Sequence, residues 1–111
     1  MKTFNGIRHT ASGDIHIERQ SGSEDDRTVY YRIWAEYTEE SRKCERRLNV
    51  DVWKHRDIFR RSKQIIWKPA EVNWSAIGSV RPETADLYAG LLTVAAEIAR
   101  ALDAEKWGVS K

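Results

Sequence analysis

Several features that would point to a particular class of protein are missing from this sequence. Cysteine occurs once, at Cys44, so no disulfide can form within the chain and a cross-linked secreted scaffold is not indicated. The longest apolar run without a charge covers residues 87–96, about half of what a membrane-crossing helix needs. Among residues 1–12 only Phe4 and Ile7 are sizeable apolar groups after the first methionine, which is no signal-peptide core. We therefore expect a soluble, cytoplasmic protein.

The motifs of common catalytic and metal sites are also missing. The three histidines are scattered along the chain, and Cys44 has none of the spacings that zinc ligands show. There is no glycine-rich phosphate loop, no Gly-x-Ser-x-Gly turn and no His-Glu-x-x-His sequence. We therefore predict a protein that is not an enzyme and that holds no metal or cofactor.

The composition is nevertheless that of a folded protein. Of the 111 residues, 41% are hydrophobic and 32% are charged, and five are tryptophan. Disordered chains are poor in aromatic residues, so this content indicates a packed core. The length is that of one ordinary domain, and we predict that residues 1–111 form a single domain.

Two segments in the middle of the chain alternate between apolar and polar residues, as half-buried strands do. In residues 28–38 one face holds five apolar or aromatic side chains, namely Val29, Tyr31, Ile33, Ala35 and Tyr37. In residues 44–53 the corresponding face holds Leu48, Val50 and Val52. A helix through 40–62 is the alternative, because Glu, Arg and Lys favour helices. The strict alternation across 48–53 favours a strand.

Shorter strands are predicted on both sides of this pair. They are a short first strand within residues 1–13, then 14–19, 64–67 and 70–80, whereas residues 54–63 have no clear pattern. Together the strands should supply a core of nine residues: Ile15, Ile17, Tyr31, Ile33, Leu48, Val50, Val52, Val72 and Trp74.

A long helix should follow the strands. Pro82 suits the first helical position, Glu83 suits the positive end of the helix dipole, and the helical pattern continues to about residue 106. We therefore predict an α+β fold: a curved antiparallel sheet of about four to five strands within residues 1–80, packed by one C-terminal helix over about 82–106.

The apolar stripe of the predicted helix is wider than one flat sheet requires, since it covers about half of the cylinder. One explanation is that the sheet curls around the helix. The other is a homodimer through this helix, because one edge of the stripe follows a heptad-like spacing through Leu87, Leu91, Val94, Ile98 and Ala101. We predict this homodimer, with these five residues at its interface.

Charge is distributed unevenly along the chain. Residues 42–68 contain ten Lys or Arg and three Asp or Glu, a net charge of +7, whereas the flanking segments carry −3 and −2. In addition, the alternation places Tyr30, Arg32, Trp34, Arg47 and Trp53 on the sheet face opposite the helix. Exposed aromatic groups in such a cluster usually mark a binding surface.

Nucleic acid is the first ligand that this combination suggests. Bases stack on aromatic rings, and Arg and Lys neutralise phosphates. We therefore predict binding of single-stranded nucleic acid through nine residues: Trp34, Arg47, Trp53, Lys54, Arg56, Arg60, Arg61, Lys63 and Trp67. An antiparallel sheet followed by a dimerising helix also resembles the general plan of Whirly-type single-stranded-DNA-binding proteins, in architecture alone, because no Whirly motif aligns with this sequence.

Two alternatives remain open at this point. Tyr, Trp and Arg are also the residues enriched at protein–protein hot spots, so the protein could instead be a small accessory or regulatory module that docks on another protein through the same face. Small chains of this kind are common in phages and mobile elements. Alternatively, the basic segment is a solvated loop and the tryptophans belong to the core or to a dimer interface.

Overall fold

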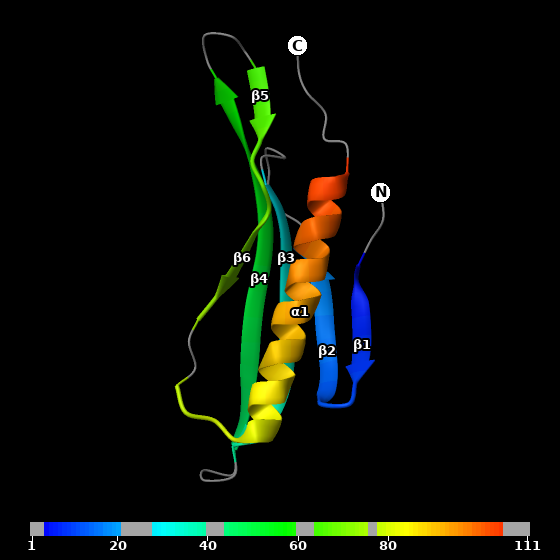
Figure 1. The fold of residues 1–111 in the computed structure, drawn as a ribbon, viewed down its shortest axis with the longest axis vertical. Coiled ribbons are helices and arrows are strands. Elements are labelled where there is room, and N and C mark those ends of the chain that lie inside the picture. The colour runs from blue at the N-terminus through cyan, green and yellow to red at the C-terminus, as the bar shows by residue number, and fades with distance from the viewer. Residues whose placement is uncertain (1–3, 21–27, 40–43, 60–63, 76–77, 106–111) are drawn as a thin grey trace.

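The computed structural model describes residues 4–20, 28–39, 44–59, 64–75 and 78–105. Six strands precede one helix (Figure 1): β1 (Gly6–Thr10), β2 (Gly13–Arg19), β3 (Thr28–Glu39), β4 (Cys44–Phe59), β5 (Gln64–Trp67), β6 (Glu71–Trp74) and α1 (Pro82–Ala104). Every strand pairing is antiparallel. The α+β fold, with an antiparallel sheet packed by a C-terminal helix, is therefore confirmed.

Strand β4 organises the sheet because it is long enough to pair with three other strands. One of its edges pairs with β3, from Cys44 opposite Glu39 to His55 opposite Thr28. Its other edge pairs with β6 at residues 50–53 and with β5 at residues 56–59. Strands β2 and β1 continue the sheet beyond β3. The segment without a clear sequence pattern is thus strand as far as Phe59, and residues 60–63 lie outside the described residues.

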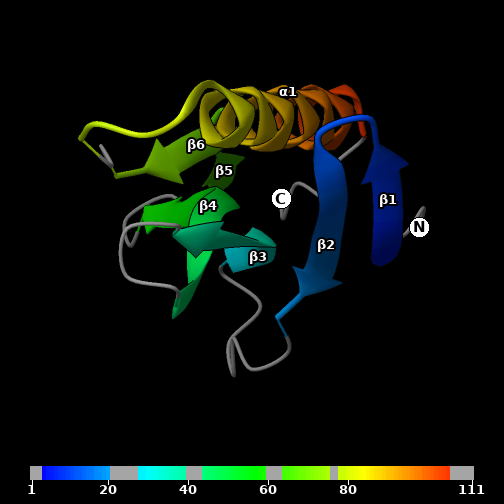
Figure 2. The ribbon, with the colours of Figure 1, turned by 90° about the horizontal axis from the view of Figure 1, so that it is seen from below.

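Seen along its long axis, the sheet curls around one side of α1, with β6 and β1 at its two ends both beside the helix (Figure 2). The inward positions of β2, β3 and β4 form the core together with the helix. Of the nine predicted core residues, seven are at most 5% exposed: Ile15, Ile17, Tyr31, Ile33, Leu48, Val50 and Val52. Each such side chain contributes roughly 1.5–3 kcal/mol on burial.

The prediction for Trp74 was wrong, because this side chain is 54% exposed. It lies on the helix side of the sheet, opposite Val50, but on the short edge strand β6. Its ring meets Tyr88 edge-to-face, with centroids 6.0 Å apart, and leaves its remaining surface uncovered. The last strand is also shorter than the predicted 70–80. It ends at Trp74, and Gly78, at φ 71°, has a left-handed conformation that no strand adopts.

Helix α1 begins at Pro82, as predicted, and ends at Ala104, two residues before the predicted limit. Its broad apolar stripe is covered by the chain's own sheet. Four residues of the heptad-like seam are at most 4% exposed: Leu87, Leu91, Val94 and Ile98. Ala101 is half-buried. These four side chains are part of the core of one chain, and curling of the sheet around the helix accounts for the width of the stripe. The homodimer stays a prediction.

Candidate functional site: the outer face of the sheet

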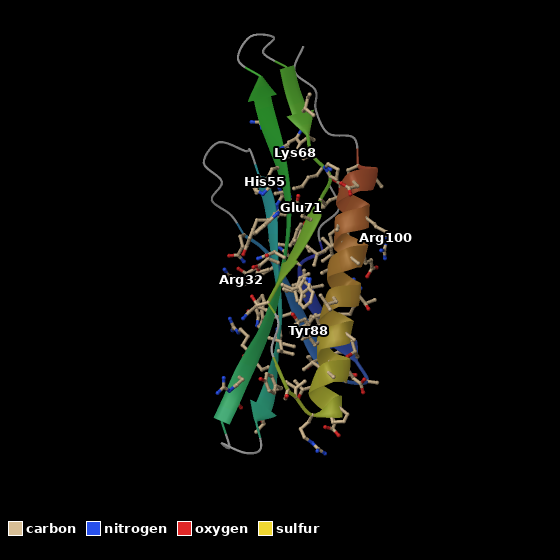
Figure 3. All side chains as sticks on the ribbon, turned by 60° about the vertical axis from the view of Figure 1, so that its left-hand side comes forward. Arg32, His55, Lys68, Glu71, Tyr88 and Arg100 are labelled. Carbon is tan, nitrogen blue, oxygen red and sulfur yellow. The ribbon has the colours of Figure 1, made fainter. Side chains whose placement is uncertain are left out.

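The face of the sheet that points away from α1, here called the outer face, carries three of the nine predicted ligand-binding residues. Trp34 on β3 and Arg47 and Trp53 on β4 occupy outward positions, and their register partners are Asn49, Glu36 and Tyr30 respectively. Figure 3 shows Arg32 and His55 on this same side, whereas Tyr88 lies between the sheet and the helix. All five residues that the alternation placed on this face lie at outward positions, namely Tyr30, Arg32, Trp34, Arg47 and Trp53.

The Trp34 side chain is held between two neighbouring strands. The His16 ring on β2 stacks on it, with centroids 5.1 Å apart and planes 12° apart. From β4, the Arg47 guanidinium carbon lies 5.2 Å from the indole centroid. Both contacts follow from the register, since β2 and β4 flank β3. The indole is thus already in contact with two protein groups, and a base that stacks on it would compete with them.

A second aromatic group surrounds Trp53. Its ring stacks with Tyr30 on β3, with centroids 6.2 Å apart, and meets His55 at 5.6 Å. The indole Nε1 donates a hydrogen bond of 3.3 Å to Glu71 on β6. His55 Nδ1 in turn lies 3.0 Å from the Thr28 hydroxyl oxygen. Three strands therefore fix this group, which makes it a rigid surface feature.

An ion pair lies between the two aromatic groups. Arg32 Nε is 4.0 Å from Asp51 Oδ1, and Arg32 is two residues from both Tyr30 and Trp34 along β3. The pKa of the Tyr30 hydroxyl is raised, first by partial burial and then through its contact with Asp51, while its hydrogen bond with Arg32 acts in the opposite direction. The Arg32 side chain is 46% exposed, so this ion pair lies at the surface between the two aromatic groups.

The charge of the outer face differs from that of the linear segment 42–68. On β1 to β4 and β6, the outward positions with described side chains carry six carboxylates and two guanidiniums, a net charge of −4 with histidines neutral. The carboxylates are Asp14, Glu18, Glu36, Glu45, Asp51 and Glu71, and the guanidiniums are Arg32 and Arg47. Both guanidiniums have carboxylate neighbours on the same face, at 4.0 Å for Arg32–Asp51 and 3.9 Å for Arg47–Glu36.

Lys54 is absent from this face. It follows Val52 by two residues, so it points inward, and it is 4% exposed. Its ammonium group lies 2.5 Å from Asp103 Oδ1 near the end of α1. Burial and pairing with a carboxylate leave this ammonium group unable to reach a phosphate, so we exclude Lys54 from the binding surface.

The remaining predicted residues belong to the hairpin of β4 and β5. Arg56 and Trp67 face each other across the two strands, with the guanidinium carbon 5.7 Å from the indole centroid. The Trp67 ring also packs against the helix-side core, so it does not share a surface with Trp34 or Trp53. Arg60, Arg61 and Lys63 fall between the strands and lie outside the described residues.

Two open hollows, of about 290 and 260 Å³, lie beside β1 and beside the start of α1. Within the described ranges, no three His, Cys, Asp or Glu side chains are grouped closely enough to hold a metal ion. No helix in the described part of the chain combines the length and apolar character needed to cross a bilayer.

The feature that sequence reasoning underweighted is the set of outward carboxylates. Glu18, Glu36 and Asp51 lie at the polar positions of segments that alternate between apolar and polar residues, so the sequence already placed them on the face away from the helix. The net charge was counted along the chain, however, and that count mixes the two faces of each strand.

Comparison of the chain with protein-family models, with curated protein sequences and with solved structures found no match.

Proposed function

We propose that the protein is a non-enzymatic binding module whose outer face docks a cationic surface of another protein. The observation that carries this proposal is the net charge of −4 around two ordered aromatic groups on an open sheet face. Opposite charges steer the encounter of two proteins and suppress the wrong partners. The aromatic groups at Trp34 and Trp53 then supply apolar contact area, with little loss of side-chain entropy because their rings are already fixed by neighbours.

The same observation argues against nucleic acid on this face. Phosphate contacts provide most of the affinity in non-specific nucleic-acid binding, and they require unpaired cations. Here Arg32 and Arg47 both have carboxylates close by, and four further carboxylates would repel a phosphate backbone. The stacking faces of Trp34 are in contact with His16 and Arg47 as well.

A fluorescence titration tests the proposal. An unstructured lysine-rich peptide, (Lys-Gly-Ser)₄, is added at two salt concentrations, and the tryptophan emission is recorded. We expect a saturable change that weakens as salt rises, because salt screens the attraction. The change should be reduced in Trp34→Phe and Trp53→Phe but kept in Trp67→Phe, whose ring lies on the other side. Absence of any change at low salt would refute the proposal.

A matched pair of charge reversals separates the outer face from the general charge of the protein. Glu18→Lys changes an exposed carboxylate on the outer face, and Asp86→Lys makes the same change on the exposed side of α1. Both raise the net charge by two. If the outer face binds the peptide, Glu18→Lys weakens binding several-fold more than Asp86→Lys does. Equal effects would mean that only net charge matters.

Single-stranded nucleic acid remains a second candidate, at the β4–β5 hairpin rather than on the outer face. The specific observation is that cations gather beside Trp67, since Lys68 is exposed directly after it and Arg56 is its partner across the two strands. The hairpin extends past the end of α1 (Figure 1). Its connecting segment supplies three more cations, at Arg60, Arg61 and Lys63. A basic hairpin that carries an aromatic ring combines phosphate contacts with stacking.

The same titration with (dT)₁₂ tests this second candidate. Quenching that Trp67→Phe abolishes and Trp34→Phe leaves unchanged would place an oligonucleotide on the hairpin. Replacing Arg60 and Arg61 with Glu should then flatten the salt dependence, since fewer counterions are released. If (dT)₁₂ causes no quenching at low salt, the hairpin does not bind single strands.

A further inference from the structure

Strand β1 forms one end of the sheet, and within the described residues only β2 pairs with it. All of its residues except Arg8 are exposed. An unpaired strand edge presents a row of free N–H and C=O groups, to which an extended chain can add as a further strand.

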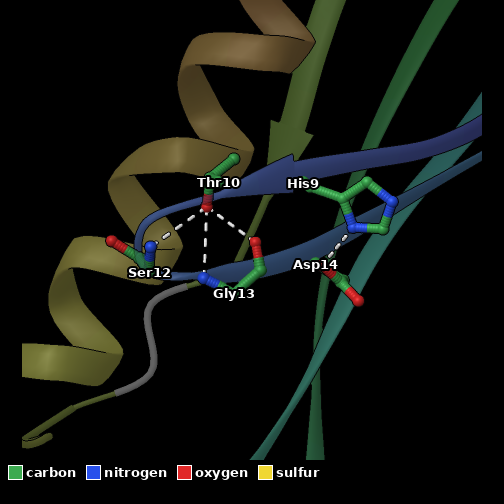
Figure 4. A network of polar contacts seen from close by, with 5 residues as sticks. All are labelled: His9, Thr10, Ser12, Gly13 and Asp14. Carbon is green, nitrogen blue, oxygen red and sulfur yellow. Dashed lines mark hydrogen bonds and ion pairs between the residues drawn. The ribbon is translucent and has the colours of Figure 1, made fainter.

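The turn between β1 and β2 shows which backbone groups face the open side. The Thr10 hydroxyl accepts a hydrogen bond from the Gly13 amide and donates one to the Gly13 carbonyl (Figure 4). The amide and the carbonyl of Gly13 thus point toward β1. Because backbone groups of successive residues in a strand point to opposite sides, those of Ile15 and Ile17 point toward β1 as well. The register pairs these residues with Thr10, Arg8 and Gly6. The backbone groups of Ile7 and His9 are therefore the ones directed outward.

The helix side of this edge has room for a side chain. A hollow of about 290 Å³ is lined by Phe4, Gly6, Ile17 and Glu97, among others. A Cβ built on Gly6 would meet no atom within 4 Å, so the space is open. On the other side of the strand, the exposed Ile7 side chain continues the cross-strand row of His16 and Trp34 on the outer face.

From these features we propose that β1 accepts an extended segment of a partner protein as an additional strand, by antiparallel or parallel addition. The segment alternates basic side chains, which lie along the acidic outer face, with small apolar side chains, which enter the hollow beside Gly6. The preference for basic residues rests on the proposed function, whereas the addition of a strand rests on the open edge alone.

A second copy of β1 fits this edge less well than a foreign segment does. Arg8 is the middle residue of the strand, and in a symmetric antiparallel pair of β1 strands it would stand opposite its own copy. Its guanidinium is ion-paired with Glu97 of α1, which holds it in place beside the edge. Inward-pointing charges of this kind discourage self-pairing of edge strands.

Amide hydrogen exchange with a synthetic probe tests the proposal. The capped peptide Lys-Val-Lys-Val-Lys-Val-Lys is added to the full chain, and exchange of individual amides is followed by NMR. We expect the Ile7 and His9 amides to exchange at least about tenfold more slowly near saturation, because they become hydrogen-bonded. The Arg8 amide, which already faces β2, should change little. Unchanged exchange at Ile7 and His9 with bound peptide would overturn strand addition.

Substitutions at residue 7 supply the matched control. Ile7→Pro removes an outward amide without removing a bond to β2, and Ile7→Ser removes the same apolar side chain but keeps the amide. We expect protection of the His9 amide to be lost in Ile7→Pro and kept in Ile7→Ser. Should Ile7→Pro fail to fold, two methylated peptides test the same hydrogen bonds. One carries N-methyl groups on its lysines and the other on its valines, and only one of these two sets of amides can face β1. Equal protection with both methylated peptides would contradict the proposal.

A shuffled peptide, Lys-Lys-Lys-Lys-Val-Val-Val, distinguishes this inference from the proposed function. It keeps the charge and loses the alternation. If it changes tryptophan emission as strongly as the alternating peptide and neither protects Ile7, the outer face binds cations and strand addition is refuted. If the alternating peptide alone protects Ile7 and His9, with no salt-dependent emission change, strand addition stands and the proposed docking on the outer face fails.

Discussion

The ammonium group of Lys54 on β4 lies 2.5 Å from Oδ1 of Asp103 near the end of α1. The same oxygen accepts a hydrogen bond of 2.8 Å from the Ala70 amide, in the connection between β5 and β6. The two members of the pair differ in their access to water, since the side chain of Lys54 is 5% exposed and that of Asp103 is 41% exposed. One carboxylate thus joins the sheet, the helix and the connection between two strands.

This asymmetry predicts unequal costs for the two halves of the pair. Asp103→Ala leaves a buried ammonium group without its carboxylate and should lower the free energy of unfolding by about 1–3 kcal/mol. Lys54→Met removes the buried charge and leaves Asp103 able to bind water, so the expected loss is below about 1 kcal/mol. Urea unfolding of the two variants measures the difference. A larger loss in Lys54→Met would contradict this account.

The pair also predicts a dependence of stability on pH. Partial burial by itself raises the pKa of the Asp103 carboxyl, but the hydrogen bonds from Lys54 and from the Ala70 amide outweigh it and hold the pKa below its ordinary value of 3.8. Because the folded-state pKa is the lower one, the stabilisation is complete above about pH 4 and is lost as pH falls through the folded-state pKa. Comparing Asp103→Asn with the parent chain by urea unfolding between pH 2 and pH 6 checks this. The difference in free energy of unfolding between the two proteins should narrow toward pH 2. A difference that stays constant would show that Asp103 does not couple stability to pH.

Leu91 is the second residue of the heptad-like seam, and it is fully buried against the sheet of its own chain. Leu91→Ala should therefore lower the free energy of unfolding by about 2–5 kcal/mol through lost burial and a new cavity. Because the contacts lie within one chain, this loss should not depend on protein concentration. Urea unfolding at protein concentrations a hundredfold apart measures it. A loss that appears only at high concentration would indicate that the seam joins two chains.

Two glycines of the β1–β2 hairpin should differ in their tolerance of a side chain. Gly6 and Gly13 both have a φ near 140°, which L-residues rarely adopt, so alanine is strained at either position. At Gly13 the added Cβ would also lie 3.2 Å from Cδ1 of Leu87, whereas at Gly6 it meets nothing. Gly13→Ala should therefore lower the melting temperature more than Gly6→Ala. Thermal unfolding followed by circular dichroism measures both melting temperatures. Equal shifts would show that the Leu87 side chain moves away from the added Cβ without a loss of stability.

Much of the fold was predictable because its signals are local. The alternation of residues 28–38 and 48–53 predicted which side chains of β3 and β4 point inward, and Pro82 marked the start of α1. The same alternation was not followed beyond Trp53, because Lys54 and Arg56 are charged residues at inward positions. A charge in the core is acceptable only with a partner, and that partner, Asp103, lies 49 residues away.

The candidate site was predicted less completely than the fold. Trp34, Arg47 and Trp53 were placed on the correct face, since a two-residue repeat sorts neighbouring side chains. Trp67 was grouped with them because it lies in the same basic stretch of sequence. Pairing of β5 with the far end of β4 instead directs the Trp67 ring toward Arg56 and the helix-side core.

The amino-acid order by itself determined the kinds of elements, the inward face of the central strands and the position of the helix. These depend on backbone preferences and on repeats of two or three to four residues. Only the tertiary structure decided that the described side chains of the outer face sum to a negative charge, that four residues of the helix seam are core and that, among the described strands, β1 has one edge without a partner. Each of these results depends on which distant segments meet, and electrostatic and packing energies are set by distances in space rather than along the chain.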